Sequence, residues 1–124
     1  MEKEYLYVGH YVDINGNYVL KIGTTNNLTK RRYQHNQYYR KQAKHHPMPK
    51  EESFVYDWFK EFALSNTKKY EKNTKHGWKS QEFGDYIPND RFVCEEKPRV
   101  IQITIRKTYK IYLWGLDKNP ALMV

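Results

Sequence analysis

The distribution of apolar and polar residues predicts a β-hairpin at the start of the chain. Residues 5–12 have the composition of a strand. Asn15-Gly16-Asn17 comes next, and these residue types tolerate the positive φ angles of a tight turn. Residues 18–24 then return as the second strand of the hairpin.

A helix and a third strand are predicted after the hairpin. Asn26 or Asn27 can cap a helix over about residues 28–44, because an asparagine side chain accepts a bond from an otherwise unpaired helical N–H. The prolines of His46-Pro47-Met48-Pro49 end that helix. Residues 53–64 are rich in aromatic side chains, which favours a strand, although this run is also compatible with a helix.

The remaining residues predict a second helix, further strands and a tail. Asn66 or Thr67 opens the helix, which continues to about Trp78. Residues 99–105 alternate in polarity as a strand does, and residues 109–114 continue the sheet after a turn. Residues 117–124 have the composition of a loose tail. We therefore expect one α+β domain over residues 1–124, with a core at about 4–95, extra strands at about 99–114, and a small mixed or antiparallel sheet flanked by helices.

The charge distribution indicates a polyanionic partner. The chain of 124 residues has a formal net charge of +8, and no carboxylate lies between Asp13 and Glu51. Tyrosines alternate with cations in that stretch, as suits nucleic acid, although a solvated basic helix face would have a similar composition. The candidate nucleic-acid-binding residues are Lys30, Arg32, Arg40, Lys41 and Lys44.

Other classes of protein are disfavoured. No apolar run is long enough to cross a membrane, and the charged N-terminus does not resemble a signal peptide. The single cysteine, Cys94, can form no internal disulfide. We expect an intracellular protein that is neither secreted nor bound to a membrane.

The hairpin and the first helix bring together residue types that suit phosphodiester hydrolysis. Arg31 and His35 are one helical turn apart and share a face of the helix. Tyr7, Tyr11 and Lys21 lie on the strands that this helix packs near. Hydrolysis needs a group that accepts a proton from water, and cations that offset the charge growing on the phosphoryl oxygens.

These residues also carry a family resemblance. Tyr5-Leu6-Tyr7-Val8, the Asn-Gly hairpin and Lys21-Ile22-Gly23-x-Thr25-x-Asn27-Leu28-x-x-Arg31-x-x-x-His35 resemble the GIY-YIG nuclease family. The resemblance is greatest to its viral and phage branch, in which Lys-Ile-Gly replaces Tyr-Ile-Gly. It covers about the first third of the chain, and the later part is similar only in layout.

The resemblance implies roles for individual residues. The first-motif tyrosine, which helps to activate the attacking water, corresponds to Tyr7, with Tyr11 as the alternative. Lys21 takes the place of the second tyrosine, either as a phosphate-binding charge or, if its pKa is lowered, in proton transfer. Arg31 corresponds to the arginine that stabilises the phosphoryl group, and His35 to a supporting histidine.

The resemblance further implies a metal ion. The family's metal-binding glutamate lies on a later helix, and Glu71 is the best candidate for it, with Glu82 as the alternative. A single carboxylate is enough for Mg²⁺ or Mn²⁺, because magnesium keeps most of its water ligands. Glu71 could instead form helical ion pairs with neighbouring lysines. Asn89 is a candidate for a family asparagine near the active site.

The leading hypothesis is therefore a metal-dependent endonuclease that hydrolyses DNA inside a host cell, in the cytoplasm or nucleus. The alternative is a catalytically weak or inactive module of viral or mobile-element origin that binds nucleic acid or a protein. The chain has no room for a separate DNA-recognition domain. Either specificity is then low, or it comes from a homodimer, a partner protein or the strands after Arg99.

Overall fold

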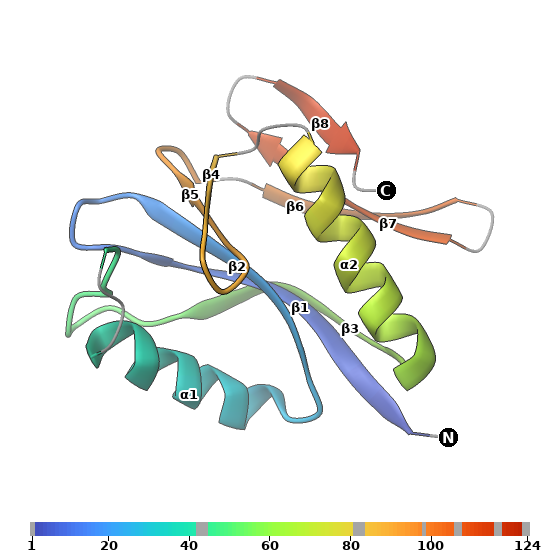
Figure 1. The fold of residues 1–124 in the computed structure, drawn as a ribbon, viewed down its shortest axis with the longest axis horizontal. Coiled ribbons are helices and arrows are strands. Elements are labelled where there is room, and N and C mark those ends of the chain that lie inside the picture. The colour runs from blue at the N-terminus through green and yellow to red at the C-terminus, as the bar shows by residue number, and fades with distance from the viewer. Residues whose placement is uncertain are drawn as a thin grey trace.

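A five-stranded antiparallel sheet is the framework of the structure (Figure 1). The computed structural model describes residues 2–41, 45–80, 84–97, 99–105, 108–115 and 118–122. The strand order is β3-β1-β2-β5-β4, and every neighbouring pair is antiparallel. The strands are β1 (Lys3–Val12), β2 (Tyr18–Thr25), β3 (Val55–Ala63), β4 (Asp85–Ile87) and β5 (Arg91–Cys94).

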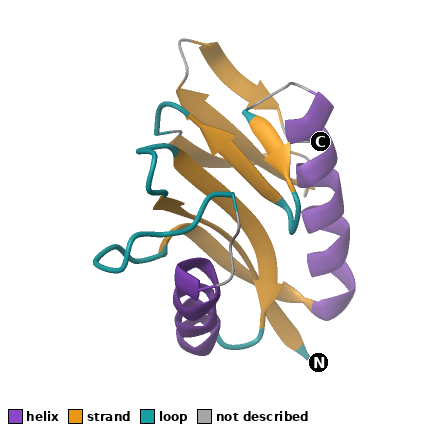
Figure 2. Cartoon of the chain, turned by 60° about the vertical axis from the view of Figure 1, so that its left-hand side comes forward, coloured by secondary structure: helices purple, strands orange, loops and turns teal. Residues whose placement is uncertain are grey.

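Two helices cover opposite faces of this sheet, as Figure 2 shows. They are α1 (Leu28–Lys41) and α2 (Leu64–Ser80). Successive side chains of a strand point to opposite faces, so β1 contributes to both layers. Leu6 and Val8 pack in one buried cluster with Trp78 of α2. Tyr7 and Tyr11 pack in the other, with Tyr39 of α1.

The C-terminal strands form a sheet of their own. β6 (Arg99–Ile105), β7 (Thr108–Gly115) and β8 (Lys118–Leu122) pair antiparallel in that order, and β7 and β8 come close to α2. Residues 109–114 continue the sheet from residues 99–105, as predicted, but the expectation of a single sheet is wrong, because these strands form a second one. The loose tail is also wrong for Lys118–Leu122, because pairing with β7 provides the backbone partners that its composition does not indicate.

The predicted fold class is confirmed, and so is the order of elements up to α2. The aromatic run at residues 53–64 is a strand, because it pairs with β1 along most of its length. The hairpin of β4 and β5 is not predicted by the sequence. Its strands are short, and the Pro88-Asn89-Asp90 turn between them places Asn89 and Asp90 at positive φ (66° and 56°).

The sheet has a gap beside the second half of β2. β1 pairs with β2 from Tyr18 to Thr25, whereas β5 pairs with it only from Tyr18 to Lys21. In the described part of the chain, no strand continues the sheet beside residues 22–25. Figure 1 shows the turn between β4 and β5 ending near this point, between the two helices. Side chains from the two faces of the sheet can therefore come together beside residues 22–25, where β5 has ended.

Candidate active site

A cavity of about 640 Å³ opens at the gap beside β2. It draws residues from β1, β2, α1, α2 and the β4–β5 turn. Five of the six predicted catalytic residues line it, namely Tyr7, Lys21, Arg31, His35 and Glu71. The sixth, Tyr11, is not in its lining. Asn89, the candidate asparagine, does line it, together with Asp90, which the sequence does not single out.

Tyr7 and His35 form a buried hydrogen-bonded pair. The Tyr7 hydroxyl lies 2.6 Å from His35 Nε2. Burial, together with the positive charges of Lys21 and Arg31, lowers the pKa of His35 to about 3. Burial also raises the pKa of Tyr7, against the influence of Arg31. The imidazole is therefore neutral, and it shares one hydrogen bond with the Tyr7 hydroxyl.

Gly23 makes room for the Tyr7 hydroxyl. The two residues face each other across β1 and β2. A Cβ atom added to Gly23 would lie 2.5 Å from the Tyr7 hydroxyl oxygen and 2.8 Å from its Cζ, closer than non-bonded atoms come. Hence the glycine of the Lys-Ile-Gly motif is needed for the position of the tyrosine of the first motif.

Lys21 reaches from β2 to the β4–β5 turn. Its Nζ donates a hydrogen bond to the Asn89 carbonyl oxygen at 2.7 Å. Burial lowers the pKa of Lys21 to about 8, with Lys75 and Arg31 acting in the same direction and Asp90 and Glu71 opposing them. The lysine therefore meets the condition for a role in proton transfer, because its pKa lies close to neutral pH.

Arg31 has hydrogen-bonding capacity to spare. Its Nη1 lies 3.4 Å from Gln34 Oε1, which is a long contact. Its Nε is buried and, within the described residues, has no hydrogen-bond partner. A buried donor without a partner is costly unless a ligand satisfies it. The guanidinium is therefore placed to donate to an anion in the cavity.

Glu71 shares the ammonium group of Lys75 with a second carboxylate, that of Asp90. Lys75 Nζ lies 3.2 Å from Glu71 Oε1 and 3.2 Å from Asp90 Oδ2. Burial would raise the pKa of Asp90, but the hydrogen bond from Lys75 and the charge of Lys21 hold it below its usual value. The helical ion pair that the sequence offers as an alternative role for Glu71 is therefore present, and it extends to Asp90.

The two carboxylates suit a hard cation. Among the described residues, no group of three or more His, Cys, Asp and Glu side chains could hold a metal ion. Mg²⁺ usually takes one or two carboxylates and completes its shell with water and substrate phosphate. Glu71 and Asp90 fit that donor set, with Lys75 as a competing cation. Glu82, the alternative ligand, lies outside the described residues.

Tyr11 has a different environment, away from the cavity. Its hydroxyl donates to the His46 carbonyl oxygen at 2.9 Å and accepts from Arg91 Nη1 at 2.7 Å. Its ring stacks on Tyr39, with centroids 4.4 Å apart. Arg91 also donates through Nε to the Pro88 carbonyl oxygen at 3.1 Å. Tyr11 thus joins the loop after α1 to the β4–β5 turn that carries the cavity residues Asn89 and Asp90.

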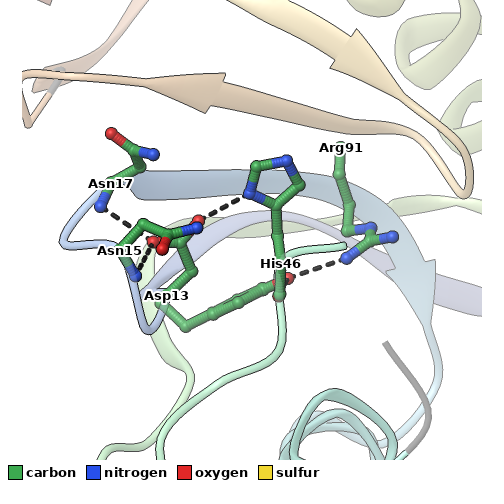
Figure 3. Close-up of polar contacts among 6 residues, drawn as sticks. Asp13, Asn15, Asn17, His46 and Arg91 are labelled. Atoms are coloured by element: carbon green, nitrogen blue, oxygen red, sulfur yellow. Dashed lines mark hydrogen bonds and ion pairs between the residues drawn. The ribbon is translucent and has the colours of Figure 1, made fainter. Parts of the chain in front are cut away.

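The buried Asp13 also holds the loop after α1 in place (Figure 3). Asp13 accepts hydrogen bonds from the backbone N–H groups of Asn15 and Asn17, both at 2.9 Å. Its second carboxylate oxygen lies 2.6 Å from His46 Nδ1. The hairpin turn and the loop after α1 are therefore held together independently of the cavity.

The predicted nucleic-acid-binding residues fall into three groups. Lys30 is exposed on α1. Arg32 donates to the Phe54 carbonyl oxygen at 2.7 Å and Arg40 to that of Glu52, so both brace the segment before β3. The Lys41 side chain and Lys44 lie outside the described residues. The sequence indicates the charges on α1 but not these contacts, which depend on the path of the chain after the helix.

A comparison with models of protein families identifies the family of the chain. The model for the T5orf172 domain matches residues 4–97. The chain belongs to the T5orf172 domain family. This is a phage-derived domain associated with GIY-YIG-like and HNH-like nucleases. The matched region of the T5orf172 domain holds all of the first sheet except Lys3, both helices and every residue of the cavity, and it ends before β6.

Comparisons with individual proteins gave no further relatives. No curated protein matched the chain. No solved structure matched it either. Separately, no helix within the described residues of the T5orf172 protein is long and apolar enough to cross a membrane.

Proposed function

We propose that this T5orf172 domain is a metal-dependent endonuclease of the GIY-YIG type that hydrolyses phosphodiester bonds in DNA. One observation supports this most strongly. Tyr7, Lys21, Arg31, His35 and Glu71 come from β1, β2, α1 and α2, yet they line a single cavity. A scaffold kept only for its basic charge has no need for a carboxylate beside the arginine.

The phosphate is held by Arg31. Arg31 donates from its unpartnered Nε to a phosphoryl oxygen, and its charge offsets the negative charge that grows there as water attacks.

Proton transfer from the attacking water falls to the hydrogen-bonded side chains on β1 and β2. The Tyr7 hydroxyl, fixed by His35, orients the water. Lys21 in its neutral form takes the proton that the water loses as its oxygen bonds to phosphorus. The bond between phosphorus and the 3′ oxygen then breaks, and the leaving oxygen takes up a proton from solvent. Tyr7 itself stays protonated, because burial raises its pKa.

Glu71, with Asp90 beside it, would hold the Mg²⁺ or Mn²⁺ ion. A bound ion would supply positive charge next to the phosphate. Lys75, which lies against both carboxylates, has to move partly away from them for the ion to bind. Glu71, the metal-binding residue that the resemblance implies, would thus share the ion with a second carboxylate, that of Asp90 in the β4–β5 turn.

A second function has one observation in its favour. Lys75 completes an ion-pair network with Glu71 and Asp90 that needs no metal. A T5orf172 domain that only binds nucleic acid or a protein could keep this network for stability. In that case, Arg31 would contribute to binding but not to turnover.

Supercoiled plasmid distinguishes the two functions. With Mg²⁺, the native protein should nick the plasmid, and paired cuts should need an oligomer or a partner, because one such site cuts one strand. Arg31→Ala and Glu71→Gln should each cut at least about a hundredfold more slowly, while the exposed control Glu61→Gln should cut normally. Chelator should abolish cleavage.

Equal behaviour of all these proteins, or cleavage that persists with chelator, would exclude the nuclease. Binding without cleavage, weakening steeply with added salt, would support the binding module instead.

A further inference from the structure

The exposed surface of α2 carries a row of lysines beside the cavity. We propose that the DNA backbone runs along this α2 lysine stripe, which consists of Lys68, Lys72, Lys75 and Lys79, and enters the cavity from it. The inference rests on the proposed function and specifies which surface holds the substrate. The sequence alone points instead to α1.

The spacing of the four lysines places them on one side of the helix. Steps of four, three and four residues return to nearly the same direction, because a helix turns once in about 3.6 residues. At about 1.5 Å per residue, the stripe is on the order of 16 Å long. It therefore extends along the helix on both sides of the cavity residue Glu71.

The stripe adjoins the cavity through Lys75. The ammonium group of this lysine contacts Glu71 and Asp90, and both carboxylates line the cavity. In Figure 1, α2 runs beside the hairpin of β4 and β5, whose turn carries Asp90. A strand of DNA lying on the other lysines of the stripe would therefore have a phosphate at the cavity rim.

Three of the four charges of the stripe are available to a ligand, since Lys75 is already paired with Glu71 and Asp90. Lys68 and Lys72 are exposed, and neither has an ion pair within the residues that the structure describes. Lys79 lies 4.0 Å from the centre of the Tyr86 ring, a contact that leaves its charge in place. On α1, by contrast, Arg32 and Arg40 already donate to backbone carbonyl groups.

A row of ammonium groups at intervals of about one helical turn suits a partner that carries regularly spaced negative charge. The phosphate backbone has this property, and lysines that bind it add affinity that falls as salt is raised. An acidic protein surface is the alternative occupant, and it is an outcome of the test below.

The test is a binding titration of a dye-labelled DNA duplex in chelator, so that no cleavage occurs. The test variant is Lys68→Gln/Lys72→Gln. The control is Lys50→Gln/Lys69→Gln, which removes the same charge. Lys69 lies on α2 but about 100° away from Lys68, and Lys50 lies in the loop before β3. Thermal unfolding checks that both variants fold.

We expect the test variant to bind roughly tenfold more weakly than the native protein, with the control close to native. The slope of log affinity against log salt should become shallower by about 0.9 for each phosphate that the variant no longer neutralises. Equal affinities and slopes for test and control would overturn the proposal. So would the absence of DNA binding by the native protein, or weaker binding of the test variant to polyglutamate but not to DNA.

The experiments can exclude the proposal of the α2 lysine stripe and the proposal of nuclease activity independently of each other. If plasmid cleavage depends on Arg31 but binding is the same in test and control variants, the nuclease stands and the stripe is excluded. If binding depends on the stripe but Arg31→Ala cuts as well as the native protein, the stripe stands and the nuclease assignment falls.

Discussion

Tyr7 and Tyr11 lie on the same strand, point to the same face of the sheet and are both buried, but their surroundings differ. The Tyr7 hydroxyl meets a neutral imidazole and opens onto a cavity with cations and carboxylates. The Tyr11 hydroxyl both donates and accepts, to His46 and from Arg91, and it is not part of the cavity lining.

The difference follows from how far the sheet extends. Tyr11 faces Val19 of β2, where β5 pairs with β2 on the far side. Tyr7 faces Gly23, beyond the end of that pairing. Where the sheet is complete, a buried tyrosine finds protein partners and becomes structural. Where the sheet stops, a buried tyrosine borders a cavity, and its hydroxyl can interact with a ligand there.

The largest expected effect comes from removing each hydroxyl in turn. Tyr7→Phe should slow plasmid cleavage at least about a hundredfold, because the group that orients the water is removed. Tyr11→Phe should leave cleavage within a few-fold but lower the free energy of unfolding by about 1–3 kcal/mol, since the buried Arg91 donor loses its acceptor. Cleavage rates and urea unfolding of both variants measure this. The reverse pattern would make Tyr11 the catalytic tyrosine.

Two glycines test the same comparison through packing. Gly23→Ala places a Cβ atom 2.5 Å from the Tyr7 hydroxyl, so cleavage should fall about a hundredfold as the tyrosine shifts. Gly9→Ala places one against the Phe54 ring and 2.5 Å from the Val55 carbonyl oxygen, and neither of these residues lines the cavity. It should mainly lower thermal stability. If Gly23→Ala cuts normally while folded, the position of Tyr7 is not critical.

The pH dependence of cleavage gives the smallest of the three effects. Below its pKa of about 8, Lys21 is mostly protonated and cannot accept a proton. The neutral fraction, and with it the single-turnover rate, should rise about tenfold per pH unit and level off above about pH 8. Lys21→Arg should be slow at every pH. A native rate that instead falls above pH 8 would show that Lys21 acts as a phosphate-binding charge.

The sequence predicts well what is local. Arg31 and His35 lie one turn apart on one helix, and the hairpin brings Lys21 and Gly23 back beside β1, so their proximity follows from short-range rules. The sequence does not distinguish Tyr7 from Tyr11, because residues four apart on a strand face the same way. The structure separates the two by their partners.

Long-range pairing explains what the sequence misses. Asp90 enters the cavity only because a four-residue strand, β5, pairs with β2 and carries the turn beside it. Neither the short strand nor its register is evident from composition. A carboxylate in a Pro-Asn-Asp turn is ordinary in isolation, although that turn is the available signal.

The short pairing between β2 and β5 also sets a limit on how stable this domain can become. Lengthening β5 and its turn by a few residues would give the N–H and C=O groups of residues 22–25 strand partners and extend the sheet. It would also place backbone where the cavity now lies. A version of the protein selected for thermal stability alone would therefore tend to close the gap and lose the cavity of its candidate active site.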